Sequence, residues 1–243
     1  MVVASPAQAR QLFHSGKLDE AIAALGAEVR DNPTDAQRRA FLFELLCFAG
    51  KYERAEKQLS VLGRGTPGAE MGALLYHAAL HGEHLRQEMF DRETFPRSPA
   101  RVVGGTLNGN AFETITDADP RIGPRLEVFA AGQYMWMPFE HVKSVRAQAP
   151  QRLRDLLWAP AIVRPSESFA GLEMGEVLLP VIAPLTWQEP EGNIRLGRIT
   201  EWRELDSGEQ VPVGQKLLLV DGEEFPMLEL RELEIAATPA TSA

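Results

Sequence analysis

Apolar and polar positions in the first third of the chain alternate with the period of an α-helix. Ile22, Leu25 and Val29 lie three to four residues apart, which places them on one helical face. The pattern predicts helices over 5–15, 18–30, 35–49, 53–62, 69–81 and 83–93. Pro33 ends the second of these helices, and we expect Gly82 to separate the last two.

Two of these helix pairs repeat one another at a spacing of 34 residues. The segment Gly16-Lys17-Leu18-Asp19-Glu20-Ala21 returns as Gly50-Lys51-Tyr52-Glu53-Arg54-Ala55. The pairs Leu12/Leu46, Leu25/Leu59 and Pro33/Pro67 keep the same spacing. That spacing is the period of a tetratricopeptide repeat (TPR), a helix-turn-helix unit that stacks with its copies to form a binding groove. The sequence therefore predicts an all-α, TPR-like domain over 1–97, with a degenerate third repeat.

The rest of the chain mixes helical and strand patterns. A stretch rich in proline, glycine and asparagine predicts a linker over 98–111. Beyond it we expect a helix over 125–131, a strand over 134–139, a short helix over 150–158, a strand over 194–202 and a hairpin that turns at Asp221-Gly222. These elements predict a mixed α+β domain with antiparallel strands over 112–235 and a frayed tail over 236–243. The predicted fold class of the whole chain is α+β.

The composition is that of a globular protein with an acidic end. The chain has 243 residues, of which 44% are hydrophobic and 24% charged, so it needs no disulfide or metal to fold. Its net charge is −9, and residues 201–243 hold 10 Asp and Glu against 3 Lys and Arg. Because a negative surface repels phosphate backbones, no nucleic-acid partner is expected.

The sequence features that indicate cellular location favour the cytoplasm. The single cysteine, Cys47, cannot form an internal disulfide, and the N-terminus lacks a basic start followed by an apolar core. The longest apolar run, 177–185, carries prolines and falls short of the roughly 20 residues that a membrane-spanning helix needs. We expect a cytoplasmic protein without a membrane span.

Three histidines are the first candidate for chemistry. His77, His81 and His84 are spaced so that a continuous helix would place them near one face, where they could bind a metal. No carboxylate stands at an obvious ligand spacing, and Gly82 is expected to break the helix. Surface or groove histidines are therefore the preferred interpretation, and no metal or other cofactor is expected.

The second candidate is a cluster of carboxylates and arginines. Asp117 and Asp119 could perform general acid and base chemistry beside Arg121. A structural interpretation needs fewer assumptions: Asp119 caps a helix that begins at Pro120, Asp117 makes a local turn, and Arg121 pairs with a carboxylate. The chain has no Gly-x-Ser-x-Gly or phosphate-loop motif, and Cys47 lies in an apolar segment without a nearby cation. No catalytic residue is expected.

Six short blocks stand in a fixed order in the second half of the chain. They span 117–127, 134–140, 154–160, 195–202, 214–218 and 226–232. Together with the helices in front, these blocks resemble the ImpE family, also called the TagJ or SciE type. We expect the following residues in these blocks to be structural: Asp117, Asp119, Pro120, Arg121, Trp136, Pro138, Trp158, Arg195 and Trp202. Most of the four tryptophans (Trp136, Trp158, Trp187 and Trp202) are expected in the core.

The resemblance implies an accessory role without catalysis in bacterial type VI secretion, a contractile injection machine. It implies binding to the small subunit of the cytoplasmic sheath, through a short helix laid in a groove, and a link to the ATPase that disassembles contracted sheaths. By register with the repeat, the predicted groove residues are Arg10, Phe13, His14, Ala40, Glu44, Cys47 and Phe48. Two alternatives stay open: a hydrolase-like enzyme that uses Asp117, Asp119 and Arg121 and is targeted by the repeats, and metal-dependent assembly through the three histidines.

Overall fold

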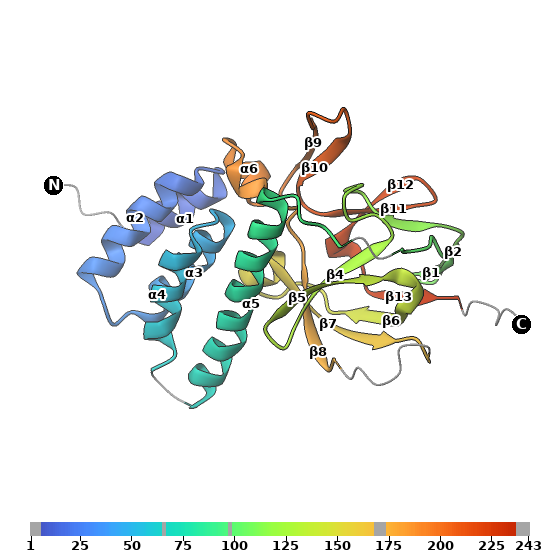
Figure 1. The fold of residues 1–243 in the computed structure, drawn as a ribbon. Coiled ribbons are helices and arrows are strands. Elements are labelled where there is room, and N and C mark those ends of the chain that lie inside the picture. The colour runs from blue at the N-terminus through green and yellow to red at the C-terminus, as the bar shows by residue number, and fades with distance from the viewer. Residues whose placement is uncertain (1–5, 65–66, 97–98, 168–173, 237–243) are drawn as a thin grey trace, which may run out of the picture.

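A layer of helices lies on one side of the molecule and a twisted set of strands on the other (Figure 1). The structure is a computed structural model that describes residues 6–64, 67–96, 99–167 and 174–236. The helices are α1 (Pro6–His14), α2 (Leu18–Asp31), α3 (Ala36–Phe48), α4 (Tyr52–Leu62), α5 (Pro67–Asp91) and the short α6 (Gly192–Arg195). Some residues of the predicted helical domain, linker and tail lie outside the described residues, namely 1–5, 97–98 and 237–243.

Helices α1 to α4 form two stacked helix-turn-helix pairs, which confirms the TPR-like prediction. The turns within the two pairs contain Gly16 and Gly50, whose φ angles of 76° and 63° are open to glycine at little cost. At the start of α3, a side-chain oxygen of Asp35 accepts a hydrogen bond of 3.0 Å from the backbone N–H of Arg38. Both turns and the Asp35 cap therefore lie where the repeat pattern places them. We call α1 to α5 the helical unit.

Helix α5 is continuous through Gly82, so the prediction of two separate helices over 69–81 and 83–93 is wrong. Gly82 is buried against β4, where an added Cβ would lie 2.6 Å from Cδ1 of Phe129. The glycine thus permits close contact between helix and sheet instead of ending the helix. The third repeat is therefore one long helix without a separate second helix.

The strands form the sheet domain, in which all described pairs are antiparallel. The strands are β1 (Gly105–Leu107), β2 (Asn110–Phe112), β3 (Ile115–Asp117), β4 (Arg125–Ala130), β5 (Gln133–Pro138), β6 (Val142–Ala147), β7 (Trp158–Pro165), β8 (Glu176–Pro180), β9 (Thr200–Glu204), β10 (Gln210–Gly214), β11 (Leu217–Val220), β12 (Glu223–Pro226) and β13 (Glu232–Ile235). An eight-stranded sheet has the order β2-β1-β13-β6-β7-β8-β4-β5, beside the sheets β10-β9 and β12-β11-β3. The α+β prediction with antiparallel strands is confirmed, and the expected linker 98–111 contains β1 and most of β2.

Four expected elements of this domain differ from the structure, and the first two are the segments 125–131 and 194–202. The segment 125–131 is the strand β4 instead of a helix, because both of its faces are covered and buried positions run consecutively from Leu126 to Ala130. The segment 194–202 is not one strand: α6 ends at Arg195, Gly197 adopts a φ of 64° that closes the helix, and β9 begins at Thr200. At β4 the structure is decided by tertiary burial, which a local pattern does not report, whereas Gly197 is a local signal that ends α6.

Two other local predictions agree with the structure, and the helices expected over 150–158 and from Pro120 do not. Residues 134–139 fall mostly in β5, and β11 and β12 form a hairpin that turns at Asp221-Gly222, with φ angles of 52° and 85°. The expected helix over 150–158 is reduced to a 3₁₀ turn, Leu153–Leu156, that leads into β7. Pro120 begins no helix, because the Asp119 segment forms a turn between β3 and β4.

Candidate functional site

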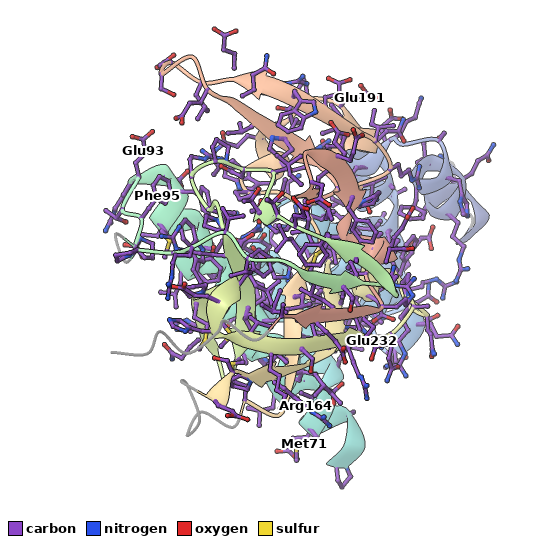
Figure 2. The ribbon with its side chains drawn as sticks, turned by 90° about the vertical axis from the view of Figure 1, so that its right-hand side faces the viewer. Met71, Glu93, Phe95, Arg164, Glu191 and Glu232 are labelled. Atoms are coloured by element: carbon purple, nitrogen blue, oxygen red, sulfur yellow. The ribbon has the colours of Figure 1, made fainter. Side chains whose placement is uncertain are left out.

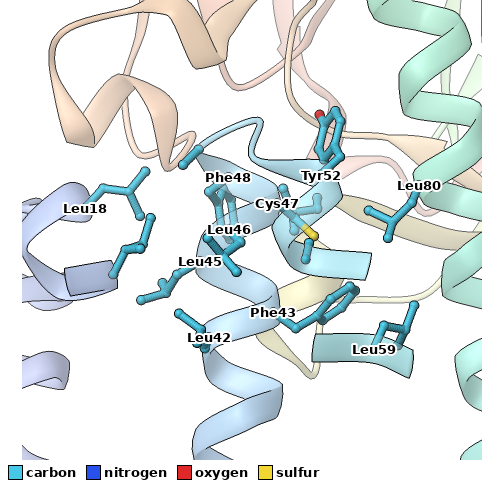
Figure 3. Close-up of a cluster of buried hydrophobic side chains, with 14 of the residues drawn as sticks. Leu18, Leu42, Phe43, Leu45, Leu46, Cys47, Phe48, Tyr52, Leu59 and Leu80 are labelled. Carbon is cyan, nitrogen blue, oxygen red and sulfur yellow. The ribbon is translucent and has the colours of Figure 1, made fainter. Parts of the chain in front are cut away.

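The predicted groove on the inner face of the helical unit is largely filled by the sheet domain. Cys47 and Phe48 are both buried, in a core that includes Leu157 and Trp158 of the sheet domain. Figure 3 shows the Cys47 side chain among the packed helices of this cluster. These two residues are therefore not exposed to a partner. Burial, together with the carboxylates of Glu83 and Glu44, raises the pKa of the Cys47 thiol well above its usual value.

Glu44 also faces the sheet domain. Its carboxylate lies 3.5 Å from a guanidinium nitrogen of Arg154, and that guanidinium lies 5.1 Å from the ring centre of Tyr76. Trp158 packs beside the same tyrosine, with ring centres 5.9 Å apart. The middle of the predicted groove is thus an interface within the chain.

The remaining predicted groove residues lie at the open end, near α1. The ring of Phe13 contacts Phe41 edge-on at 5.5 Å, and the guanidinium of Arg198 lies 4.7 Å from its centre. Arg198 also donates hydrogen bonds of 2.8 and 3.0 Å to the carbonyls of Phe13 and His14. Arg10 is exposed and Ala40 half-buried. The structure therefore separates the predicted set into a buried group and a partly exposed group.

The two repeat glycines receive equivalent contacts from the sheet domain. A Cβ at Gly16 would lie 2.5 Å from Oδ1 of Asn193, and a Cβ at Gly50 would lie 2.7 Å from Cγ of Trp187. Between these contacts, Asp19 accepts hydrogen bonds from Arg195 at 2.6 Å and from Lys51 at 2.8 Å. The segment that contains Trp187 and α6 therefore packs against both repeat turns.

A buried ion network joins α5 to the strands, and we define it as Arg86, Glu127, Lys216 and Asp117. Arg86 donates to both carboxylate oxygens of Glu127, at 2.7 and 3.1 Å. Lys216 lies 2.5 Å from Glu127 and is also paired with Asp117. Tyr134 donates a further hydrogen bond to Glu127. Residues far apart in the sequence therefore fix the helical unit to the sheet domain.

The two carboxylates of this network have opposite pKa shifts. Burial alone would raise the pKa of Glu127, but Arg86 and Lys216 outweigh it and lower that pKa to about 2. Burial dominates at Asp117, and with the negative charge of Glu127 it raises the Asp117 pKa to about 7 against the opposing effect of Lys216. The pKa of Lys216 is itself raised, because the two carboxylates outweigh the effect of its burial. Glu127 is thus held ionised, while Asp117 titrates near neutral pH.

Asp117, Asp119 and Arg121 stabilise a turn. The backbone N–H of Asp119 donates to Asp117 at 2.9 Å, and Arg121 binds the Asp119 carboxylate through nitrogens at 2.6 and 2.9 Å. The side chains of Asp117 and Asp119 are both 0% exposed. The arrangement holds the ends of β3 and β4 together, and neither carboxylate is open to a substrate.

The tryptophans differ in burial. Trp158 lies in the core and donates a hydrogen bond of 2.9 Å to Glu83, as expected of a structural residue. Trp136, Trp187 and Trp202 are only half-buried, so the prediction that most of the four lie in the core is wrong. Trp136 stacks on Phe95 with ring centres 5.6 Å apart, close to the half-buried Pro138 that ends β5.

The histidines point toward α4 or remain exposed. Nδ1 of His77 lies 3.6 Å from Glu56, and the ring of His84 contacts that of Tyr52 at 5.5 Å. Within the described residues, no group of three or more His, Cys, Asp and Glu side chains is arranged to hold a metal ion. No helix in the described part of the chain combines the length and apolar character required to cross a membrane.

Sequence reasoning missed an apolar surface on the first half of α5. Met71, Leu74 and Leu75 are exposed there, at 69, 65 and 47%. They border a hollow of about 880 Å³, the α5 hollow, lined by Gly68, Met71, Gly72, Leu74, Leu75, His77, Ala78, Ala79, Phe129, Ala131, Gly132, Glu176 and Leu178. Its signal in the sequence is the apolar stretch Met71 to Leu75, which by its spacing predicts a helix but not an exposed surface.

Fold and site together define a class: a short TPR-like stack whose inner face is closed by an antiparallel-sheet domain. A family model described as ImpE protein matches residues 109–234, and a tetratricopeptide-repeat model matches residues 12–76. The chain belongs to the ImpE family, which confirms the resemblance seen in the sequence blocks.

Individual relatives agree with this assignment. The chain is 34% identical over 269 aligned residues to the type VI secretion system accessory component TagJ of Pseudomonas aeruginosa, with 96% of this chain and 92% of TagJ covered. The crystal structure of protein VPA1032 from Vibrio parahaemolyticus has a similar fold, with a TM-score of 0.82 and 22% identity over 97% of this chain and 100% of that chain.

Proposed function

We propose that this protein is a non-enzymatic adaptor of a bacterial type VI secretion system that acts in the cytoplasm. The observation that carries the proposal is the 34% identity, over 96% of the chain, to a protein named as an accessory component of that system. TPR-like helices support a role in protein binding. In this proposal the partner is the small subunit of the sheath, and the adaptor links it to the ATPase that disassembles the sheath.

The test is isothermal titration of the full-length protein with purified small sheath subunit, both shown to be folded by circular dichroism. We expect saturable binding with a Kd of about 1 μM or tighter. The large sheath subunit alone serves as the comparison. If the folded small subunit gives no heat and no complex on gel filtration, the adaptor proposal is wrong.

The hydrolase alternative has weaker support. It requires Asp117 and Asp119 to meet a substrate, yet both side chains are buried, and both are bound by cations of the same chain. Replacing both by Asn should lower stability, because Arg121 loses the carboxylate of Asp119, while Lys216 keeps that of Glu127.

A further inference from the structure

A small cavity lies at the second half of α5, where the helical unit meets the sheet domain. Its volume is about 30 Å³, and it is lined by residues of α3, α4 and α5 on one side and by Leu157 and residues 182–187 on the other. None of the described residues that line it also lines the α5 hollow. Figure 2 shows Glu191, which follows this segment, at the opposite end of the molecule from Met71. The cavity is therefore separate from that hollow, and it has room for one water molecule.

Two buried N–H groups on the wall of this cavity lack an acceptor among the described residues. They are Nε2 of Gln87 on α5 and Nε1 of Trp187 in the 3₁₀ turn Thr186–Gln188. A buried N–H group without an acceptor is costly, and proteins contain few of them. Because the two groups line one cavity from different elements, a single acceptor atom in that cavity would satisfy both.

The Trp187 indole is held in place by the backbone before it and by a repeat turn. Leu185, on the same wall, has a φ of 60°, in the left-handed region that leucine rarely adopts. Backbone of this kind persists only where its surroundings fix it. Thr186 is buried and accepts a hydrogen bond of 2.9 Å from the backbone N–H of Gly214, and a Cβ at Gly50 would lie 2.7 Å from Cγ of Trp187. These contacts keep the indole N–H beside the cavity and away from bulk solvent.

The charged groups of the wall determine which ligand fits. The carboxylate of Glu83 lines the cavity, and its side chain is 8% exposed. One of its oxygens accepts a hydrogen bond of 2.9 Å from Nε1 of Trp158, and the other lies 3.6 Å from a guanidinium nitrogen of Arg86, which leaves lone pairs for a further donor. Glu83 would repel an anion, and a cation cannot accept hydrogen bonds from Gln87 and Trp187. The ligand must accept two hydrogen bonds and donate at least one, and in about 30 Å³ that ligand is water.

We propose that this cavity binds one water molecule, which accepts hydrogen bonds from Trp187 and Gln87 and donates one to the carboxylate of Glu83. The water joins the segment before α6 to α5 and so connects the sheet domain with the helical unit. Because Arg86 lines the same cavity, this bridge lies beside the buried ion network. It also positions the indole that packs against the repeat turn at Gly50. Neither the cavity nor its donors depend on the proposed adaptor function.

A crystal structure of the unaltered full chain, at a resolution that shows ordered water, tests the site directly. We expect a water oxygen within about 3.2 Å of both Nε1 of Trp187 and Nε2 of Gln87. Well-defined side chains without such a water, or a protein acceptor bound to either nitrogen, would overturn the proposal. A chloride or other anion at this position would overturn it as well.

Nuclear magnetic resonance of the full chain tests the site in solution. A water held in a cavity gives nuclear and rotating-frame Overhauser peaks of opposite sign to a nearby indole N–H, whereas rapidly exchanging surface water does not. We expect this pair of peaks for Trp187, whose signal is identified by its loss in Trp187→Phe. The indole of Trp202 donates an exposed hydrogen bond of 3.0 Å to Glu224, and it should lack the pair. Absence of the pair at Trp187 contradicts a bound water.

Gln87→Leu removes one donor and keeps a side chain of similar size. Loss of that hydrogen bond should weaken the opposite-sign peaks of Trp187 about threefold or more. The matched control is Gln37→Leu, which makes the same substitution at an exposed position of α3 and should leave the peaks unchanged. Circular dichroism establishes that both variants are folded. Equal peaks in the unaltered chain and in Gln87→Leu would show that they arise from a nearby hydroxyl such as that of Thr186, and the bridging water would be excluded.

Discussion

The second half of α5 buries charged side chains, whereas its first half exposes apolar ones. Arg86 and Glu83 are 4 and 6% exposed, although charged residues rarely lie in a protein interior unless they are paired. On the first half, Met71 and Leu74 stand in solvent. One continuous helix thus reverses the usual distribution of residue types along its length.

This difference separates the part of α5 that packs against the sheet domain from the part whose apolar side chains are exposed to solvent. Buried ion pairs contribute little net stability but penalise any arrangement that leaves a charge unpaired. The buried ion network therefore specifies how α5 sits on β4. The exposed apolar side chains do not constrain the packing of α5 in this way. Their removal from water would stabilise a complex only if a partner covered them.

The largest expected effect is on the buried half. Arg86→Met should lower the free energy of unfolding by about 3–5 kcal/mol, because Glu127 would keep its charge in the interior with one cation fewer. Urea unfolding followed by circular dichroism measures the change.

The control for this variant is Arg92→Met, at the exposed end of the same segment. Arg92 lies 2.6 Å from Glu88 with both side chains more than half exposed, and loss of such a pair should cost about 0.5 kcal/mol or less. Equal losses for the two arginines would show that the network does not hold the domains together.

A smaller effect should appear in the pH dependence of stability. The pKa of Asp117 is raised to about 7 in the folded protein, so the folded state holds a proton that the unfolded state releases near the ordinary value of 3.8. Stability from this group is present at low pH and is lost as the pH rises toward 7. Asp117→Asn removes the titration, so the stability of the unaltered chain relative to this variant should fall by on the order of 2 kcal/mol from pH 5 to pH 7.

Asp221→Asn is the matched control for this pH profile. Backbone N–H groups of Thr114 and Glu113 lower the Asp221 pKa, so this carboxyl is ionised in both states throughout that interval. Its stability difference from the unaltered chain should not change between the two pH values. A flat profile for Asp117→Asn as well would contradict the assigned pKa.

The helix pairs and the buried ion network differ in how far the sequence predicts them. The helix pairs could be predicted because local signals suffice: apolar spacing, Pro33, and glycines at the turns with positive φ. The hairpin at Asp221-Gly222 could be predicted for the same reason. None of these elements depends on which distant segment packs against it.

The site depends on distant segments, and prediction failed there. Arg86, Glu127 and Lys216 meet only after α5, β4 and the residue before β11 have packed together. The helix prediction for β4 is wrong because burial of both faces removes the alternation of apolar and polar residues that predicts a strand. The groove residues Cys47 and Phe48 were placed correctly on α3, but no local pattern reveals that the sheet domain covers them. Glu127 and Lys216 do lie in two of the six ImpE-type blocks, which was the one available signal.

The smallest predicted effect compares one substitution in the two halves of α5. Gly72→Ala should stabilise the chain by about 0.5–1 kcal/mol, because its Cβ meets open space and alanine is the better helix former. Gly82→Ala gains the same propensity but places a Cβ 2.6 Å from the ring of Phe129, which is buried and cannot move freely. Overpacking of this kind costs about 1–3 kcal/mol, so the net change should be a loss of about 1 kcal/mol. Thermal and urea unfolding of both variants measures whether each substitution raises or lowers stability. A stabilising Gly82→Ala would mean that α5 lies farther from β4 than the structure has it, and the contrast between its two halves would no longer hold.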